Sequence, residues 1–519
     1  MKQRDFFKSA SILALAGFIT KVIGALYRIP LTNIVGAEAI GVYQLIFSVY
    51  ALFLTSSAGG LPAGLSKLVA EEKALGGGQT GRIVGGSMGF VGLTGLFFAA
   101  VLIFFARPLA AVQGNPDVAF GYIVIAPAIF FVGITSVFRG YFQGNLDMMP
   151  TAASQIIEQI VKLTAGLIFA SVLIKKGVLY GAAGAVLGVV VSELLAAVYL
   201  CVLFRRRGGR LIPASGFKEM RSVFKKVAKY SIPITVGGVL MPLTQFADSF
   251  LVVNILNKTG LALNVSTSLY GILTGPVSSL INLPVVMTIA LAVVIIPVVS
   301  RQKTRGNIRE ILAKSNFAIK VALFIGVPAA ILFAALSSEI MSVLYPNFSA
   351  FELAAASRLL AISAIGIIFL AATQIFTALL QALDKPFLPV GNMAFALLLK
   401  IVLNIVLIKP IGIYGAAVST AAAYFTAAAL NFISLGRLIG VNRNIPLAVL
   451  KTAAAGACMA GFIFLTKNAA ENLYLKLFLT AFIAAAAYML ISLFISLFTD
   501  DELASLPLGR KLIKLKGGR

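Results

Sequence analysis

Apolar runs of about 20 residues follow one another along most of the chain, and short polar segments separate them. An α-helix rises about 1.5 Å per residue, so about 20 apolar residues cross the roughly 30 Å hydrocarbon core of a bilayer. The pattern predicts an all-α polytopic membrane protein with about 14 transmembrane helices, and its longest run should kink at Pro276 or Pro284. The predicted spans are 9–29, 42–66, 83–105, 119–142, 151–174, 181–204, 230–256, 267–299, 316–336, 355–381, 387–408, 412–436, 446–466 and 474–498.

The longest polar segment between predicted spans lies at 205–229 and leaves six spans before it. Sequence markers recur across this segment: Tyr180-Gly-Ala-Ala matches Tyr414-Gly-Ala-Ala, and Gln143 and Gln381 each precede a Leu-Asp pair, at offsets of about 234 and 238. Two copies of a six-span unit keep the same orientation, so we expect two pseudo-symmetric six-helix bundles. The predicted parts are an N-terminal bundle (1–204), a basic linker (205–229), a C-terminal bundle (230–436), two extra helices (437–498) and a basic tail (499–519).

The composition supports a membrane protein and argues against most enzyme classes. Of 519 residues, 60% are hydrophobic and 12% charged, and the mean hydropathy is +0.99, whereas soluble domains are nearer half apolar and a quarter charged. The chain has no histidine, which is the commonest metal ligand and general base, and its two cysteines form no CxxC pair. We therefore predict no catalytic residues, no metal site and no cofactor other than a coupling ion.

The distribution of Lys and Arg predicts the orientation in the membrane. Alternate loops carry about 28 and about 6 of the 43 basic residues, and the larger share is on the side of the N-terminus. Basic loops stay in the cytoplasm, so both termini of this multi-pass protein are expected there. The net charge of +25 is explained by this topology, and no nucleic acid partner is predicted, because the chain offers no soluble basic domain.

The first predicted span contains two cations, Lys21 and Arg28. They are two helical turns apart and share one face with Gly17 and Gly24, so one side of the helix is small and basic. A cation in hydrocarbon persists only beside water, a counter-charge or an anionic ligand. The alternative is that both side chains extend to the membrane interfaces, since the helix is expected to end at Pro30.

Further charges lie on the fourth to sixth spans. Arg139 is on the fourth span, Glu158 and Lys162 are one turn apart on the fifth, and Glu193 is on the sixth. Together with the two cations of the first span, the N-terminal bundle has four cations against two acids, which favours an anionic substrate. The alternative for Glu158 and Lys162 is a buried ion pair that only joins helices. The polar face of the fifth span consists of Thr151, Ser154, Gln155, Glu158, Gln159 and Lys162.

The C-terminal bundle is less charged. Asp248 on the seventh span needs a partner in hydrocarbon, such as Lys400 on the eleventh span or a bound cation. Two bundles around a polar midplane are typical of an alternating-access transporter, whereas the ring of repeated filter residues expected of a channel is not seen.

Two segments carry a family resemblance: YRIPLTNIVGAEAIGVYQ at 27–44 and GLPAGLSKLVAEE at 60–72. They resemble the stage V sporulation protein B group of the polysaccharide-transport branch of the MOP exporter superfamily, close to the MurJ-type lipid II flippases. The resemblance implies a MOP/MATE-like plan of 6+6+2 helices in the bacterial cytoplasmic membrane. It implies a flippase for an undecaprenyl-pyrophosphate-linked, lipid II-like precursor of peptidoglycan or polysaccharide biosynthesis, with a role in growth or sporulation.

The resemblance also implies a substrate site. The pyrophosphate headgroup would contact Lys21, Arg28, Arg139 and Lys162, with Glu158 beside them, and the isoprenoid tail would lie in a groove beside the last two helices. Lys21 and Arg28 occupy the neighbourhood of two basic residues of the flippases, although their spacing differs by about one residue. The flippases' basic residue on the eighth helix has no counterpart, because 267–299 contains no charge.

A coupling-ion site is implied in the second half of the chain. Asn404 has a context similar to that of a sodium ligand in the family, and Asp248 and Thr420 are its candidate partners for Na⁺ or H⁺. Expected partners are the lipid-linked sugar, membrane lipid and proteins of cell-wall synthesis.

Three other functions stay open from the residues alone, and one of them is a non-transporting scaffold, against which the aligned polar faces argue. A MATE-type cation-coupled drug antiporter would share the architecture but would need an acidic cavity for its cationic substrates. A membrane glycosyltransferase would need carboxylate motifs on long outward loops, and the predicted outward loops are short.

Overall fold

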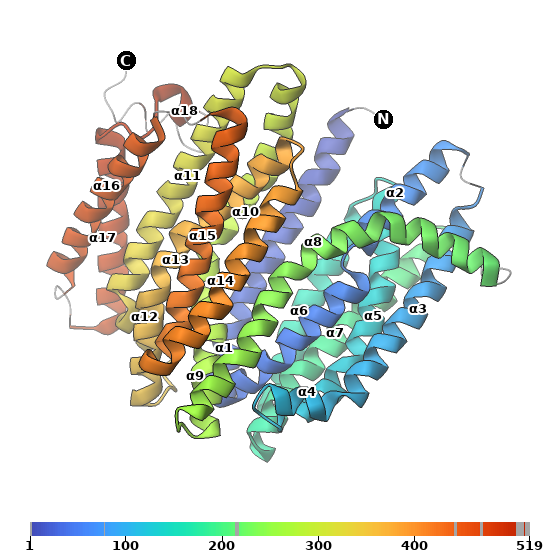
Figure 1. Ribbon diagram of the computed structural model, residues 1–519, viewed down its shortest axis with the longest axis horizontal. Helices are drawn as coiled ribbons and strands as arrows, with labels where there is room; N and C mark the ends of the chain where they lie inside the picture. The colour runs from blue at the N-terminus through green and yellow to red at the C-terminus, as the bar shows by residue number, and fades with distance from the viewer. Residues whose placement is uncertain are drawn as a thin grey trace. The chain divides into compact units, whose positions relative to one another are not determined.

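The computed structural model describes residues 3–76, 78–212, 217–440, 444–467, 471–504 and 513, and every regular element in these ranges is helical (Figure 1). Residues 213–216 of the predicted linker and most of the predicted tail, 505–512 and 514–519, lie outside the described residues. The elements are α1 Gln3–Ala58, α2 Leu61–Ala74, α3 Thr80–Phe104, α4 Ala106–Val112, α5 Val118–Gly144, α6 Met149–Leu173, η1 Ile174–Lys176, α7 Val178–Arg206, α8 Phe217–Lys258, α9 Leu263–Ile272, η2 Leu273–Val277, α10 Ser278–Thr304, α11 Ile308–Ala335, α12 Ser337–Leu344, α13 Ala350–Ala382, α14 Phe387–Ile411, α15 Ile413–Ile439, α16 Asn444–Thr466, α17 Leu473–Phe494 and α18 Asp500–Ala504.

Within the described residues, 13 helical runs are long and apolar enough to cross a membrane, which confirms a polytopic all-helical membrane protein. The first run, Leu15–Ala74, is 60 residues long and covers two predicted spans, 9–29 and 42–66. At about 1.5 Å per residue it is roughly three times longer than one crossing needs. This single run accounts for the difference from the predicted count of about 14.

The break in α1 falls at Gly36, not at Pro30 as the sequence predicts. Pro30 lies inside the helix, and the backbone leaves the helical region at Gly36, where φ is 81°. A proline within a membrane helix is tolerated when neighbouring groups satisfy the carbonyl that it frees, whereas a left-handed φ is readily adopted only by glycine. The chain descends from its N-terminus and returns towards α2 in Figure 1.

The chain packs as two compact units, Met1–Pro276 and Val277–Arg519, here called unit 1 and unit 2. Unit 1 extends beyond the predicted linker because α8 packs on α1, α2 and α3, and α9 packs on α1. Within unit 2, α13 packs against α10, α11 and α15. The division into two six-helix bundles at 205–229 concerns the sequence repeat and stays a prediction.

The long run predicted at 267–299 is interrupted at Pro276, one of the two predicted positions. The helix is broken into α9 and α10 by the π-turn η2, which contains Pro276. Proline has no backbone N–H to donate, and the wider turn absorbs the missing hydrogen bond. Pro284 lies inside α10, so the helix is interrupted only at the first site.

Similar turns occur in the two halves at the spacing of the sequence markers. Leu146 and Asp384, 238 residues apart, both adopt a left-handed backbone with φ of 61° and 59°. Each turn closes a helix through a hydrogen bond to the carbonyl of the preceding glutamine, Gln143 or Gln381. The recurrence of a conformation that non-glycine residues rarely adopt supports a structural repeat.

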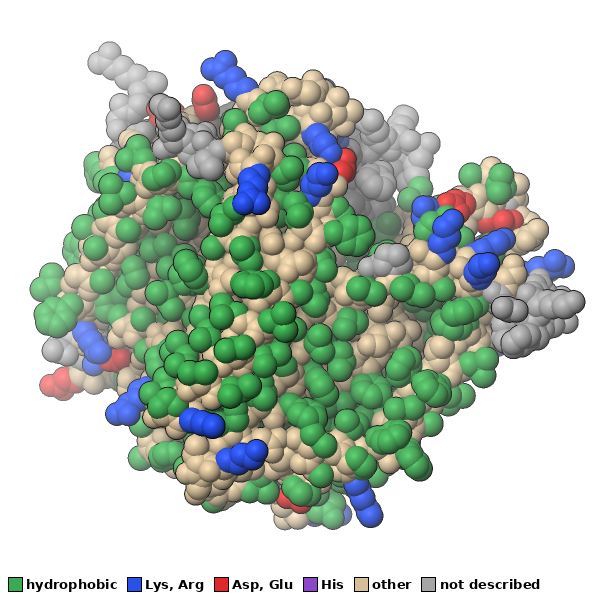
Figure 2. All heavy atoms as spheres, in the orientation of Figure 1, with side chains coloured by type: hydrophobic (Ala, Val, Ile, Leu, Met, Phe, Trp, Pro, Cys, Tyr) green, Lys and Arg blue, Asp and Glu red, His purple; other side chains and the backbone are tan. Residues whose placement is uncertain are grey.

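Hydrophobic side chains cover the middle of the helices on the face shown in Figure 2, and Lys and Arg lie mainly near helix ends. Among the exposed apolar residues, Phe97, Phe464 and Phe482 have exposed fractions of 62%, 82% and 65%. Such extensive apolar exposure suits hydrocarbon contact rather than water.

Close backbone contact joins α1 to α9 in unit 1. A Cβ added to Gly41 would lie 2.1 Å from the carbonyl oxygen of Thr267, and one added to Gly271 would lie 2.5 Å from the carbonyl oxygen of Ala37. The two helices therefore approach through glycines, as is common between membrane helices.

We expect Gly41→Ala to destabilise the protein by about 1–3 kcal/mol, because the new methyl group meets a backbone oxygen that has no space to move into. The matched control is Gly92→Ala on α3, where an added Cβ has nothing within 4 Å. Thermal unfolding in detergent, followed by circular dichroism, measures the difference. Equal unfolding temperatures for the two variants would show that the contact is not tight.

Candidate functional site

An ion pair lies at the centre of the charged cluster in unit 1. Arg139 Nη2 on α5 is 2.9 Å from Glu158 Oε2 on α6, and Arg139 Nε donates to Ser154 Oγ at 3.0 Å. The exposed fractions of the Arg139 and Glu158 side chains are 15% and 18%, so the pair is largely shielded. The structure brings these two predicted site residues together, whereas the sequence suggests Lys162 as the partner of Glu158.

Lys162 contacts an aromatic ring instead. Its Nζ lies 5.0 Å from the centroid of the Phe47 ring on α1, a cation–π distance. Phe47 stacks on Tyr43 at 5.8 Å and contacts Tyr50 at 5.7 Å. Within the described residues, Lys162 makes no ion pair, so its ammonium is held by a ring and not by a carboxylate.

The basic stripe of α1 faces the polar face of α6. A Cβ added to Gly24, which lies between the two cations, would be 3.4 Å from Gln159 Oε1. Lys21 is exposed, and Arg28 is partly buried. This contact brings the polar face of α6 beside the α1 stripe, and a polar site shared by Lys21 and Arg28 stays a prediction.

Arg28 also reaches the broken helix of unit 1. Its Nη1 donates to the carbonyl oxygen of Thr274 at 3.1 Å, and Gln44 Nε2 donates to the same oxygen at 2.6 Å. Thr274 belongs to the π-turn η2, where backbone carbonyls need partners from outside the helix. The sequence reasoning missed Gln44 and Thr274; an amide in an apolar run and a proline two residues after a threonine were the available signals.

Glu193 on α7 is a further member of this cluster. Its exposed fraction is 7%, and it lies within electrostatic range of Arg139, Glu158 and Lys162. A lone acid in an apolar span is its sequence signal.

The three residues proposed to hold a coupling ion are divided between the units. Asp248 on α8 belongs to unit 1, and Asn404 on α14 and Thr420 on α15 belong to unit 2. Asn404 is fully buried, one turn after the buried Lys400, whereas Thr420 Oγ1 donates to the carbonyl oxygen of Ala416 on its own helix at 2.8 Å. An ion site formed by these residues stays a prediction.

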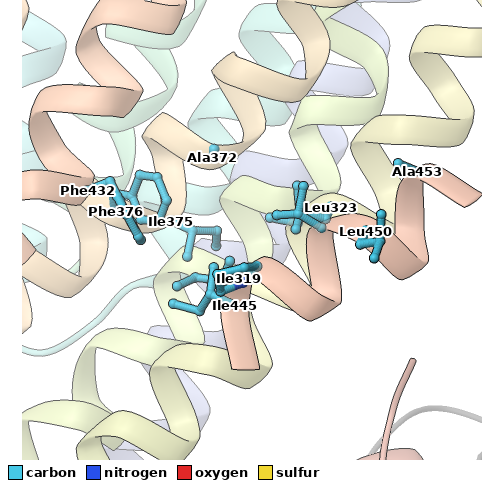
Figure 3. A pocket seen from close by; sticks show the side chains of 12 residues that line it. Ile319, Leu323, Ala372, Ile375, Phe376, Phe432, Ile445, Leu450 and Ala453 are labelled. Carbon is cyan, nitrogen blue, oxygen red and sulfur yellow. The ribbon is translucent and has the colours of Figure 1, made fainter. Parts of the chain in front are cut away.

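Unit 2 contains an apolar groove of about 560 Å³ (Figure 3). Side chains from α11, α13, α15 and α16 line it, and all those shown in Figure 3 are hydrocarbon. The lining residues are Ile319, Ala322, Leu323, Ala372, Ile375, Phe376, Phe432, Ile445, Pro446, Val449, Leu450 and Ala453.

Ion pairs hold the last two spans against the rest of unit 2. Glu502 in α18 accepts from Lys320 Nζ on α11 at 3.0 and 2.8 Å. Glu339 in α12 lies 3.4 Å from Lys467 Nζ and 3.5 Å from Lys476 Nζ, at the ends of α16 and α17. The pair of Glu339 and Lys467 lies at the end of α16, and α16 forms one wall of the groove.

Comparison with known proteins identifies the family. Residues 6–303 match the family described as polysaccharide biosynthesis protein, which is more than half of the chain. The chain belongs to this family.

Two relatives from Bacillus subtilis (strain 168) extend the match beyond the family region. Stage V sporulation protein B is 28% identical over 528 residues, covering 99% of this chain and 100% of the relative. Lipid II flippase MurJ is 28% identical over 463 residues, covering 84% of this chain and 83% of the relative. The family resemblance in the N-terminal segments is thus confirmed over the whole chain.

Solved structures confirm the fold of this family member. The inward closed conformation of a lipid II flippase MurJ matches with a TM-score of 0.73 at 16% identity, covering 93% of this chain and 98% of the other. An inward-facing multidrug resistance MATE transporter of the MOP superfamily matches with a TM-score of 0.69 at 14% identity, covering 81% and 94%. The chain therefore shares its fold with these two proteins.

We expect Arg139→Met to be more destabilising than the double substitution Arg139→Met with Glu158→Met. The single variant leaves an uncompensated carboxylate in a shielded site, at a cost of about 3–5 kcal/mol, whereas replacing both charges is often nearly neutral. Thermal unfolding of the three proteins in detergent measures the coupling.

The matched control is the exposed pair of Lys303 and Asp384, 2.5 Å apart, whose Asp384 side chain has an exposed fraction of 82%. Lys303→Met should change stability by no more than about 1 kcal/mol. If Arg139→Met were as mild as Lys303→Met, the cluster would be hydrated and not shielded.

Proposed function

We propose that the chain is an alternating-access flippase that moves an undecaprenyl-pyrophosphate-linked saccharide, of the lipid II type, outward across the bacterial cytoplasmic membrane. The observation that carries the proposal is the cluster of cations in the membrane spans of unit 1, where Arg28, Arg139 and Lys162 meet the facing polar surfaces of α1 and α6. The name of its relative lipid II flippase MurJ supports the same substrate class.

The cluster suits a diphosphate. Charge-assisted hydrogen bonds to phosphate oxygens are about twice as strong as neutral ones, and arginine can bind them in a bidentate manner. Glu158 would then act by holding Arg139 until the anion arrives, because a carboxylate itself repels phosphate. Lys21, exposed on the same stripe of α1, would make the first contact.

The apolar groove in unit 2 suits the isoprenoid tail. A long hydrocarbon chain gains no hydrophobic energy by leaving lipid, so a groove must accept it by shape and van der Waals contact. The groove between α16 and the helices α11, α13 and α15 has only apolar lining residues, and α16 is the first of the two extra helices.

Outward movement of the headgroup would be favoured by the membrane potential, because an inward-negative potential contributes about 2.3 kcal/mol per charge per 100 mV to the exit of an anion. A coupling cation, Na⁺ or H⁺, would reset the empty carrier. Both termini lie in the cytoplasm in this proposal, which follows the asymmetry of basic loops.

The deciding experiment is translocation of fluorescent lipid II in proteoliposomes. We expect Arg28→Gln to reduce the rate at least tenfold, because glutamine retains a donor for the Thr274 carbonyl but loses the charge that binds phosphate. Lys21→Ala should act in the same direction. Lys258→Ala, at an exposed position at the end of α8, is the control and should leave the rate unchanged.

If both Arg28→Gln and Lys21→Ala translocated lipid II at the wild-type rate, the headgroup would not bind at α1. Failure of the wild-type protein to move any polyprenyl-linked sugar, together with export of cationic dyes, would instead favour the drug antiporter.

A second prediction concerns the groove. Ala453→Phe should slow translocation of undecaprenyl-linked lipid, because the ring fills part of the space that the tail would occupy. A short-chain analogue should be moved at the wild-type rate. The neighbouring Ala454→Phe, outside the lining, is the control, and equal inhibition of both lipids by either variant would contradict the assignment of the groove to the tail.

A further inference from the structure

Glu193 has a buried carboxyl oxygen without a hydrogen-bond donor. Among the described residues, Oε2 of Glu193 accepts no hydrogen bond, and the exposed fraction of the residue is 7%. Its depth follows from the packing of α6 on α7, where a Cβ added to Gly188 would lie 2.3 Å from the Cα of Gly166. The glycine contacts show that α6 and α7 are antiparallel, because residues further along α7 meet residues earlier in α6. Glu193 therefore lies level with 158–162, near the middle of α6.

The charged and titratable groups that face Glu193 come from every helix around it. They are Arg139 on α5, Glu158 and Lys162 on α6, and Tyr50 on α1. Neither cation pairs with Glu193, because Arg139 bonds to Glu158 and Lys162 lies over the Phe47 ring. Tyr50 is also buried, and its hydroxyl has no partner among the described residues.

An ionised carboxylate in this position would be a buried charge with an unsatisfied oxygen, which is among the most costly arrangements in a membrane protein. The negative charge of Glu158 nearby adds repulsion. A single proton on Glu193 removes the buried charge and the repulsion. We propose that Glu193 is a proton-binding site of unit 1 and is a neutral carboxylic acid in the conformation described here.

In a second state, the Glu193 carboxyl group has lost its proton and forms an ion pair with the Lys162 ammonium group. When Lys162 turns from Phe47 to Glu193, the carboxyl O–H bond breaks, the proton passes to water, and a carboxylate–ammonium pair forms. When Lys162 turns away, the carboxylate takes a proton from water. Charge is balanced in both directions, and no further reactant is needed.

The proton and the anionic headgroup bind together, an extension that rests on the proposed function. An anion that draws Lys162 or Arg139 is repelled by an ionised Glu193 but not by a neutral one. Linkage is reciprocal, so protonation of Glu193 raises the affinity for the anion as much as the anion raises the affinity for the proton.

Infrared spectroscopy of the protein in phosphatidylcholine liposomes tests the proton site directly, without any ligand. At pH 7 we expect the wild-type protein to show the C=O absorption of a protonated carboxyl group, sensitive to exchange into D₂O. This band should be lost in Glu193→Gln and shifted in frequency in Glu193→Asp, which keeps the acid if the glutamine variant does not fold.

Glu339→Gln is the matched control. Glu339 has the same exposed fraction of 7% and also has one oxygen without a hydrogen-bond donor, but two ammonium groups lie within 3.5 Å of its other oxygen. These ammonium groups stabilise a carboxylate, so the substitution of Glu339 should leave the band in place. A spectrum unchanged by both Glu193 variants would overturn the proposal.

Binding of undecaprenyl pyrophosphate in detergent tests the linkage. Above the pH at which the infrared band disappears, the affinity of the wild-type protein should fall by up to about tenfold per pH unit, whereas Glu193→Gln should show a constant affinity. If the band is present but the affinity of the wild-type protein does not follow it, the proton site stands and the placement of the headgroup beside it is wrong.

Discussion

A polar group in hydrocarbon needs a partner, and this requirement explains the placement of nearly every polar side chain discussed above. Hydroxyl groups within spans, such as Thr135 and Ser192, donate to carbonyls of their own helices. Charged groups cannot be satisfied in this way, and they gather in unit 1 around Arg139 and Glu158. The same requirement applies to the backbone, since the Thr274 carbonyl at the π-turn is supplied with donors from α1.

The requirement also shows how much of the protein could be predicted from its sequence. Long apolar runs of this kind form spanning helices in a membrane, so the spans follow from the pattern, whereas the choice of Pro276 over Pro284 as the interruption does not. The break at Gly36 could not be predicted with the same ease. Proline lacks the backbone N–H donor, but it can still lie within a helix, as Pro30 does. The position at which the chain turns back depends on packing against other helices.

The charged residues of the unit 1 cluster could be named from the sequence, but their pairing could not. Helical spacing puts Glu158 and Lys162 on one face, one turn apart, and an ion pair between them is the natural expectation. The structure pairs Glu158 with Arg139, which is on a different helix, because the guanidinium can bond to Ser154 and Glu158 together. Contacts between helices decide such choices, and no periodicity in a single sequence contains them. Glu193 was overlooked as a site for the same reason, since its missing partner is visible only when its neighbours are known.

The two units differ in chemistry in a manner that matches an amphipathic substrate. Unit 1 contains shielded charges, and unit 2 contains a groove with only apolar lining residues. A lipid with an anionic headgroup needs both kinds of surface. A cationic drug needs neither a net positive cluster nor a groove shaped for a long tail, although the MATE fold is shared.

The cations of unit 1 also differ in how readily they can be released to a ligand. Separating Arg139 from Glu158 leaves a shielded carboxylate uncompensated, at a cost of about 3–5 kcal/mol. Lys162 gives up only its contact with the Phe47 ring, which is worth about 0.5–2 kcal/mol. Of these two cations, Lys162 is therefore the one that an anion can draw away at the lower cost. When Lys162 moves away, a neutral Glu193 loses no ion pair, whereas an ionised Glu193 would lose a nearby positive charge. A proton on Glu193 therefore permits the movement of Lys162, which is also the less costly of the two releases.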